Sequence, residues 1–181
     1  RDRSPSRGLG DVYKRQGVAY DDNAFRLFFE RFGSEEWFRR TLFVFVADHV
    51  SSEKFAAQTR SYPGNYHIIG FMYTPDGALR GEVSEVVQQL DIMPTLLGLL
   101  GNREPYFAFG RDVLNEPQRP QWSVSWDGAF QAVTNDGTIR FDDAQETPAA
   151  SSAGDSLLQD FRALVQQYYS HAEKKSYIVH D

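Results

Sequence analysis

The residues best suited to chemistry in this sequence are an acidic side chain and a histidine that follow a strongly apolar run. Residues 41–47 read Thr-Leu-Phe-Val-Phe-Val-Ala, and Asp48 and His49 come directly after them. An unbroken run of this kind, rich in β-branched and aromatic residues, predicts a strand buried on both faces of a parallel sheet. Because open α/β sheets bind ligands at the carboxyl ends of their strands, the pair is predicted to occupy a functional position.

The two side chains offer the donors of a mixed oxygen and nitrogen metal site. A carboxylate supplies a hard, charged oxygen and a neutral imidazole supplies a nitrogen, a combination that suits Mn²⁺ or Zn²⁺ better than Ca²⁺. A cation would also offset the cost of placing a carboxylate at the end of a buried strand. From the dipeptide alone an alternative stays open, in which Asp48 caps a turn and His49 is an ordinary polar loop residue.

Other polar and aromatic residues carry weaker signals. His67 begins a second predicted strand, where it could contact a substrate or could be a partly buried histidine at a strand edge. Asp91 stands where it can cap a helix. Trp122 and Trp126 share one face of a predicted strand, so they could line a sugar or lipid-headgroup cleft or pack against the main sheet.

The elements that must position these residues include both helices and strands. Residues 20–32 place four phenylalanines on one helix face, 66–73 read as a second strand, and 83–100 read as helical, in one or two pieces. The order helix, strand, strand, helix predicts an α/β fold with a mostly parallel sheet flanked by helices.

The C-terminal third follows a different pattern. The alternating stretch 121–143 contains the turn signal Asn135-Asp136-Gly137, which predicts a small antiparallel meander. A final amphipathic helix is expected beyond it, with four apolar or aromatic residues on one face, Leu157, Phe161, Leu164 and Tyr168.

Bulk composition excludes several classes of function. With 181 residues, 41% of them hydrophobic, the chain can form one domain with its own core. It has no cysteine, which excludes disulfide scaffolds and thiol catalysis. No stretch approaches the roughly 18 consecutive apolar residues that a membrane-spanning helix needs, so the chain itself is expected to be soluble. Beyond residue 16 the net charge is −9, which argues against nucleic acid or an anionic membrane surface as the main partner.

Residues 1–16 differ from the rest of the chain. They hold five basic and two acidic residues and have no apolar period. We expect them to be a disordered, non-native leader that is neither a helix nor a signal peptide. The native sequence would then begin in mid-domain, near Gly17.

Several strings, taken in order, resemble the sulfatase-like domain of lipoteichoic acid synthases and related phosphoglycerol transferases. They are YDDNAFRLFFERF with TLFVFVADH, then YHIIGFMYTPDG, VVQQLDIMPTLLGLLG and FAFGRDVL, and together they cover about residues 18–114. The resemblance implies a truncated alkaline-phosphatase-like fold, in which residues 17–181 are the C-terminal part of the catalytic domain. Val50 stands where the family often has glycine and Ile69 where it usually has proline, which leaves the subgroup open.

The resemblance also implies a metal and a missing nucleophile. Asp48 and His49 would be two ligands of one divalent ion, manganese in the synthases, with zinc, magnesium or calcium as alternatives. In that family the metal lowers the pKa of a threonine hydroxyl that attacks phosphorus. This threonine and a further acidic ligand lie in the family's N-terminal half and have no counterpart in this sequence. The isolated chain is therefore expected to be inactive.

The implied function is transfer of a phosphoglycerol or related phospho-alcohol group from a lipid-linked donor to an envelope glycan or glycolipid. A sulfatase or phosphoester hydrolase of the same superfamily is an alternative, because many sulfatases carry the same pair. A non-catalytic envelope-binding module is a third possibility. Full-length relatives are anchored in the cell membrane with the catalytic domain outside the cytoplasm, and the same location is expected of the full-length protein.

Overall fold

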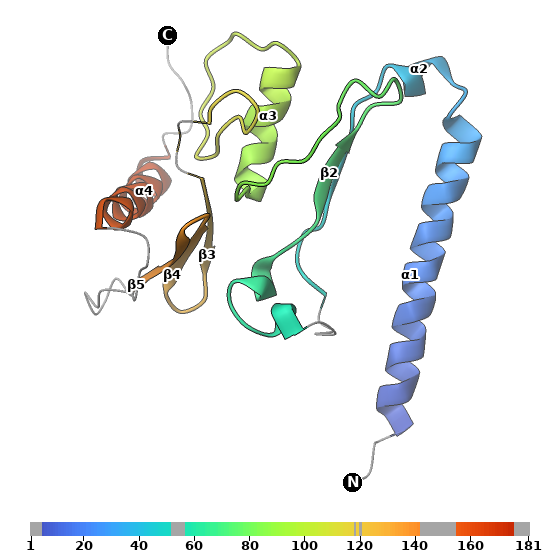
Figure 1. The fold of residues 1–181 in the computed structure, drawn as a ribbon, viewed down its shortest axis with the longest axis horizontal. Coiled ribbons are helices and arrows are strands. Elements are labelled where there is room, and N and C mark those ends of the chain that lie inside the picture. The colour runs from blue at the N-terminus through green and yellow to red at the C-terminus, as the bar shows by residue number, and fades with distance from the viewer. Residues whose placement is uncertain (1–4, 52–56, 118, 120, 142–154, 176–181) are drawn as a thin grey trace. The chain divides into compact units, whose positions relative to one another are not determined.

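The computed structural model of the chain describes residues 5–51, 57–117, 119, 121–141 and 155–175. In chain order the elements are α1 (Pro5–Phe32), α2 (Glu36–Arg39), β1 (Phe43–Val46), η1 (Ala57–Arg60), η2 (Gly64–Tyr66), β2 (Gly70–Tyr73), η3 (Gln89–Asp91), α3 (Ile92–Leu99), β3 (Trp122–Trp126), β4 (Phe130–Thr134), β5 (Gly137–Phe141) and α4 (Asp155–Lys174), as Figure 1 shows. Contacts divide the chain into two units, Arg1–Phe45 with Gly70–Gly81, and Val46–Ile69 with Glu82–Asp181.

Aromatic rings hold the first unit together. The rings of Phe28 and Phe29 in α1 lie 6.2 and 5.5 Å from that of Phe38 in α2. Phe38 is buried, and its ring lies 4.7 Å from that of Phe43 in β1. Ring pairs at such distances add about 0.5–1.5 kcal/mol beyond the burial of their surface. The phenylalanine face predicted for this helix is confirmed as the face that packs.

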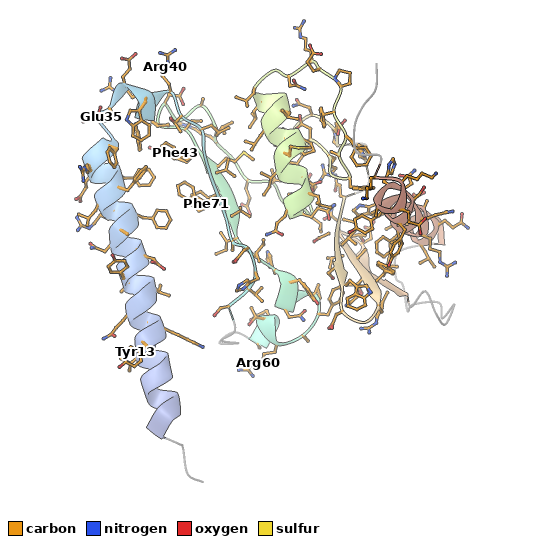
Figure 2. All side chains as sticks on the ribbon, turned by 180° about the vertical axis from the view of Figure 1, so that it is seen from behind. Tyr13, Glu35, Arg40, Phe43, Arg60 and Phe71 are labelled. Atoms are coloured by element: carbon orange, nitrogen blue, oxygen red, sulfur yellow. The ribbon has the colours of Figure 1, made fainter. Side chains whose placement is uncertain are left out.

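β1 and β2 form a two-stranded sheet. The ring of Phe45 stacks on that of Phe71 at 4.7 Å, and the ring of Phe43 lies 6.0 Å from that of Tyr73. Figure 2 shows Phe43 and Phe71 on the side of the strands that carries the aromatic contacts with α1. Phe43 is opposite Tyr73 and Phe45 is opposite Phe71, so residue numbers rise along β1 as those of their partners fall along β2. The two strands therefore run antiparallel.

The sheet therefore differs from the one we predicted. A shared sheet for the strands within 41–47 and 66–73 is confirmed, but the described strands do not include a mostly parallel sheet with β1 in its interior. A parallel connection needs a crossover of a dozen or more residues, usually an α-helix. In the described part of the segment between β1 and β2, only the short turns η1 and η2 are helical.

The first helix also begins earlier than predicted. We expected a helix over residues 20–32, and α1 begins at Pro5, so it includes most of the stretch predicted to be disordered. Proline is well tolerated in a first helical turn, where its missing N–H would have no partner. Val12 and Tyr13 are exposed, and Figure 2 shows Tyr13 towards the N-terminal end of α1. The lack of an apolar period in residues 5–16 is why their sequence did not indicate a helix.

The core of the second unit lies between the meander and α4. β3, β4 and β5 pair antiparallel in that order, and Thr134 stands opposite Gly137 at the tight turn. Gly137 has a φ of 147°, which glycine adopts without the strain that a side chain would cause. The buried apolar cluster consists of Trp122, Ala132, Ile139, Phe161 and Val165. The predicted meander and final amphipathic helix are confirmed.

In the part of the chain that the structure describes, none of the helices combines the length and the apolar character needed to cross a bilayer. This holds for α1 as well, although it has 28 residues.

Candidate metal centre

Asp48 and His49 lie where β1 ends. The last backbone hydrogen bond before them runs from the N–H of Ala47 to the carbonyl of Ile69, at 3.0 Å. The chain then bends at Asp48 and His49, whose side chains are 87% and 78% exposed. The pair thus follows a strand end, as the sequence indicated, and both side chains are accessible to solvent.

The two side chains lie next to each other. Nε2 of His49 is 3.5 Å from Oδ2 of Asp48, and the backbone N–H of His49 donates to Oδ1 of Asp48 at 2.9 Å. Nδ1 of His49 lies 2.8 Å from the carbonyl oxygen of Val50. Because a carbonyl oxygen can only accept, Nδ1 carries the proton in this contact. In the neutral imidazole this leaves the lone pair of Nε2 free, which is the state that a metal ligand requires.

The donors fit part of a metal site. A carboxylate oxygen and a neutral imidazole nitrogen within 3.5 Å suit a borderline divalent ion such as Mn²⁺ or Zn²⁺. Among the described residues, however, no group of three or more histidine, cysteine or acidic side chains could hold a metal ion. Zinc sites use three or four protein donors, so the pair supplies about half of such a set.

A residue from a distant part of the sequence holds the backbone of the pair. Nε2 of Gln89, the first residue of η3, donates to the carbonyl of Ala47 at 2.9 Å and to that of Asp48 at 3.2 Å. No pattern in the sequence pointed to Gln89, because 41 residues separate it from Asp48.

Asp91 is a structural carboxylate. It is 2% exposed, and its two oxygens accept from the backbone N–H of Gln88 at 3.0 Å and of Arg111 at 2.8 Å. The carbonyl of Asp91 accepts from the hydroxyl of Thr95 at 2.7 Å. The predicted cap on the helix that begins at Ile92 is wrong, because Asp91 precedes α3 without a side-chain cap. Its carboxylate instead forms a capping box with Gln88 on η3. No capping-box signature marks this position in the sequence, because that signature has Ser or Thr first and Glu or Gln three residues later.

His67 lies before β2, because β2 begins at Gly70 and not at residue 66. The side chain of His67 is exposed, and its backbone N–H donates to the carbonyl of Gly64 at 3.2 Å. It is only two residues from Ile69, the partner of Ala47. In the described part of the chain no hydrogen bond or ion pair joins His67 to Asp48 or His49, so its role in substrate binding stays a prediction.

The two tryptophans have different surroundings. Trp122 is buried, and its ring lies 5.8 Å from that of Phe161 in α4. Trp126, at the other end of β3, is 64% exposed. Trp122 is therefore a packing residue, but its described contacts are with α4, and packing against the main sheet, as predicted, is not confirmed.

Comparison with known families gives a match over the part of the chain that contains the pair. Residues 13–102 match a family model described as sulfatase, and this stretch includes Asp48, His49 and Gln89. Over these residues the chain is similar to the sulfatase family, whose superfamily consists of hydrolases and transferases that generally use a divalent metal. No significant match was found among curated proteins or among solved structures.

Proposed function

We propose that this chain is part of a metal-dependent phosphoglycerol or phospho-alcohol transferase that acts on envelope glycans or glycolipids. Asp48 and His49 would hold one divalent ion, Mn²⁺ foremost. The observation that carries the proposal is the approach of Nε2 of His49 to Oδ2 of Asp48, at 3.5 Å, on two exposed side chains within the sulfatase match.

Each residue of the pair would contribute differently. Asp48 would supply negative charge, and His49 a nitrogen whose direction is set by the contact of Nδ1 with the Val50 carbonyl. A bound divalent ion would offset charge on the phosphoryl oxygens and lower the pKa of an attacking hydroxyl. The nucleophile would come from a part of the full-length protein outside this chain. The full-length protein would be anchored in the cell membrane. Its donor would be a lipid-linked phosphoglycerol and its acceptor an envelope glycan.

A sulfatase or phosphoester hydrolase is the second candidate, favoured by the family model that matches. Asp48 and His49 would serve both reactions, because both develop negative charge on oxygen atoms around a central phosphorus or sulfur. The nucleophile distinguishes the candidates, since threonine indicates transfer and a modifiable cysteine or serine indicates sulfatase chemistry.

The test joins this chain to the upstream coding sequence of its gene and measures turnover of a phosphatidylglycerol-like donor and of an aryl sulfate. Asp48→Ala and His49→Ala should each lower turnover by more than about 100-fold, because even residues that only support metal ligands are worth 10–100-fold. His67→Ala is the matched control and should lower turnover far less. If a folded Asp48→Ala variant kept most of the activity, the proposal would be refuted. Turnover of the sulfate ester alone would favour the second candidate.

A further inference from the structure

We infer that Gln89 is a positioning residue for the Asp48–His49 pair, an inference that rests on the proposed metal role of that pair. Its side-chain amide donates from one nitrogen to two successive backbone carbonyls, those of Ala47 at 2.9 Å and Asp48 at 3.2 Å. Through these contacts Gln89 would fix the bend that turns both side chains to solvent.

The two acceptors show why a bend is needed. In an extended strand, successive carbonyls point to opposite sides, so one donor cannot reach two neighbours. The backbone turns at Asp48, which lets the carbonyls of Ala47 and Asp48 converge on Nε2 of Gln89. The same turn allows the Asp48 carboxylate and the His49 ring to approach each other, although neighbouring side chains in a strand point to opposite faces.

The residues on either side of Gln89 are held by buried and partly buried contacts. The preceding residue, Gln88, donates its N–H to the carboxylate of Asp91 at 3.0 Å and accepts from the N–H of Val124 in β3 at 3.2 Å. The other oxygen of Asp91 accepts from the N–H of Arg111. The start of η3 is thus tied to β3 through the side chain of Gln88, and its end to the segment around Arg111 through the carboxylate of Asp91. Because its neighbours are anchored in this way, the side chain of Gln89 can stabilise the backbone bend at Asp48.

The pair has little other support. In the described part of the chain, the polar contacts of the Asp48 and His49 side chains stay within residues 48–50. The side chain of Gln89 is exposed, so replacing it opens no cavity in the core and should leave folding intact. An effect of replacing Gln89 should therefore be confined to the bend and the pair.

The experiment records NMR spectra of the metal-free chain and follows the backbone amides of Ala47–Val50 and the ring of His49. Gln89→Glu keeps the shape of the side chain but removes both donors and sets an oxygen against two carbonyl oxygens. We expect these signals to shift and the His49 amide to exchange with solvent about two- to tenfold faster. Gln89→Met, which removes the donors without adding charge, should act in the same direction.

Gln88→Glu is the matched control. It makes the same charge change one residue earlier but retains an oxygen that can accept from Val124, so the signals of residues 47–50 should stay unchanged. The inference is overturned if Gln89→Glu and Gln89→Met leave those signals unchanged, or if Gln89→Met unfolds the chain, because Gln89 would then support the fold in general. Line broadening of the His49 ring by added Mn²⁺ tests the proposed function separately. If Mn²⁺ does not broaden the His49 ring while Gln89→Met disorders the bend, the metal role of the pair is refuted and the positioning role of Gln89 is supported.

Discussion

Nε2 of His49 and Oδ2 of Asp48 lie 3.5 Å apart on successive residues that are both open to solvent. In a continued strand these side chains would point to opposite faces of the sheet. The bend after β1, the N–H of His49 on Oδ1 of Asp48, and the amide of Gln89 on the backbone make their approach possible. A metal role for the pair therefore depends on this backbone geometry as much as on the residue types.

Removing the buried carboxylate of Asp91 should destabilise the second unit. Asp91→Ala leaves the N–H groups of Gln88 and Arg111 buried without their acceptors, and we expect a loss of about 2–5 kcal/mol in the free energy of unfolding. Asp91→Asn keeps one acceptor oxygen and should cost less. Urea unfolding measures both. Asp160→Ala, on an exposed position of α4, is the control and should change stability by less than about 0.5 kcal/mol. Equal effects at the two positions would contradict a stabilising role for the hydrogen bonds to the Asp91 carboxylate.

Replacing glycine by alanine should have opposite effects on stability at two positions. A Cβ at the buried Gly110 would overlap the carbonyl group of Leu90, so Gly110→Ala should destabilise the protein by about 1–3 kcal/mol. At Gly17 nothing lies within 4 Å of such a Cβ, and the position is inside α1. Gly17→Ala should therefore raise helix stability by about 1 kcal/mol. Circular dichroism during thermal unfolding compares them, and a neutral Gly110→Ala would show that the segment is looser than the structure indicates.

Burial raises the pKa of the Tyr62 hydroxyl from 10.0 to about 12. Between these values the unfolded chain releases the proton and the folded chain keeps it, so the stability that Tyr62 contributes should be lost as the pH rises from 10 to 12. In a pH titration followed by the absorbance of tyrosinate, one of the nine tyrosines should ionise at a higher pH than is usual for tyrosine. Tyr62→Phe should remove this late step, whereas Tyr66→Phe, whose ring lies 6.0 Å from that of Tyr62, should leave it in place. A late step that persists in Tyr62→Phe would assign it to another residue.

Features with partners close in the sequence could be predicted. The Asn135-Asp136-Gly137 signal located the turn between β4 and β5, whose paired residues are 3 to 11 positions apart in the sequence. The end of the apolar run at Ala47 located the Asp48–His49 pair. In both cases a local rule, turn chemistry or hydrophobic pattern, indicates where the feature lies along the chain.

Features that depend on distant partners could not be predicted. The antiparallel pairing of β1 with β2 is set by which rings meet across the strands, and the apolar run is compatible with either direction. Gln89 reaches Asp48 over 41 residues, and Asp91 reaches Arg111 over 20. Such contacts leave no periodic pattern in the sequence, which is why the support of the candidate site became visible only in three dimensions.

The most direct test of the central claim, that Asp48 and His49 are metal ligands, is Mn²⁺ titration of the chain followed by NMR. Weak binding is expected, because two protein donors leave the rest of the coordination shell to water. Mn²⁺ should broaden the His49 ring and the Asp48 and Val50 amides before any other signals. Asp48→Ala should abolish this selective broadening in a folded chain, and His67→Ala should retain it. Broadening that persists in Asp48→Ala, or that begins at residues remote from the pair, would contradict the account.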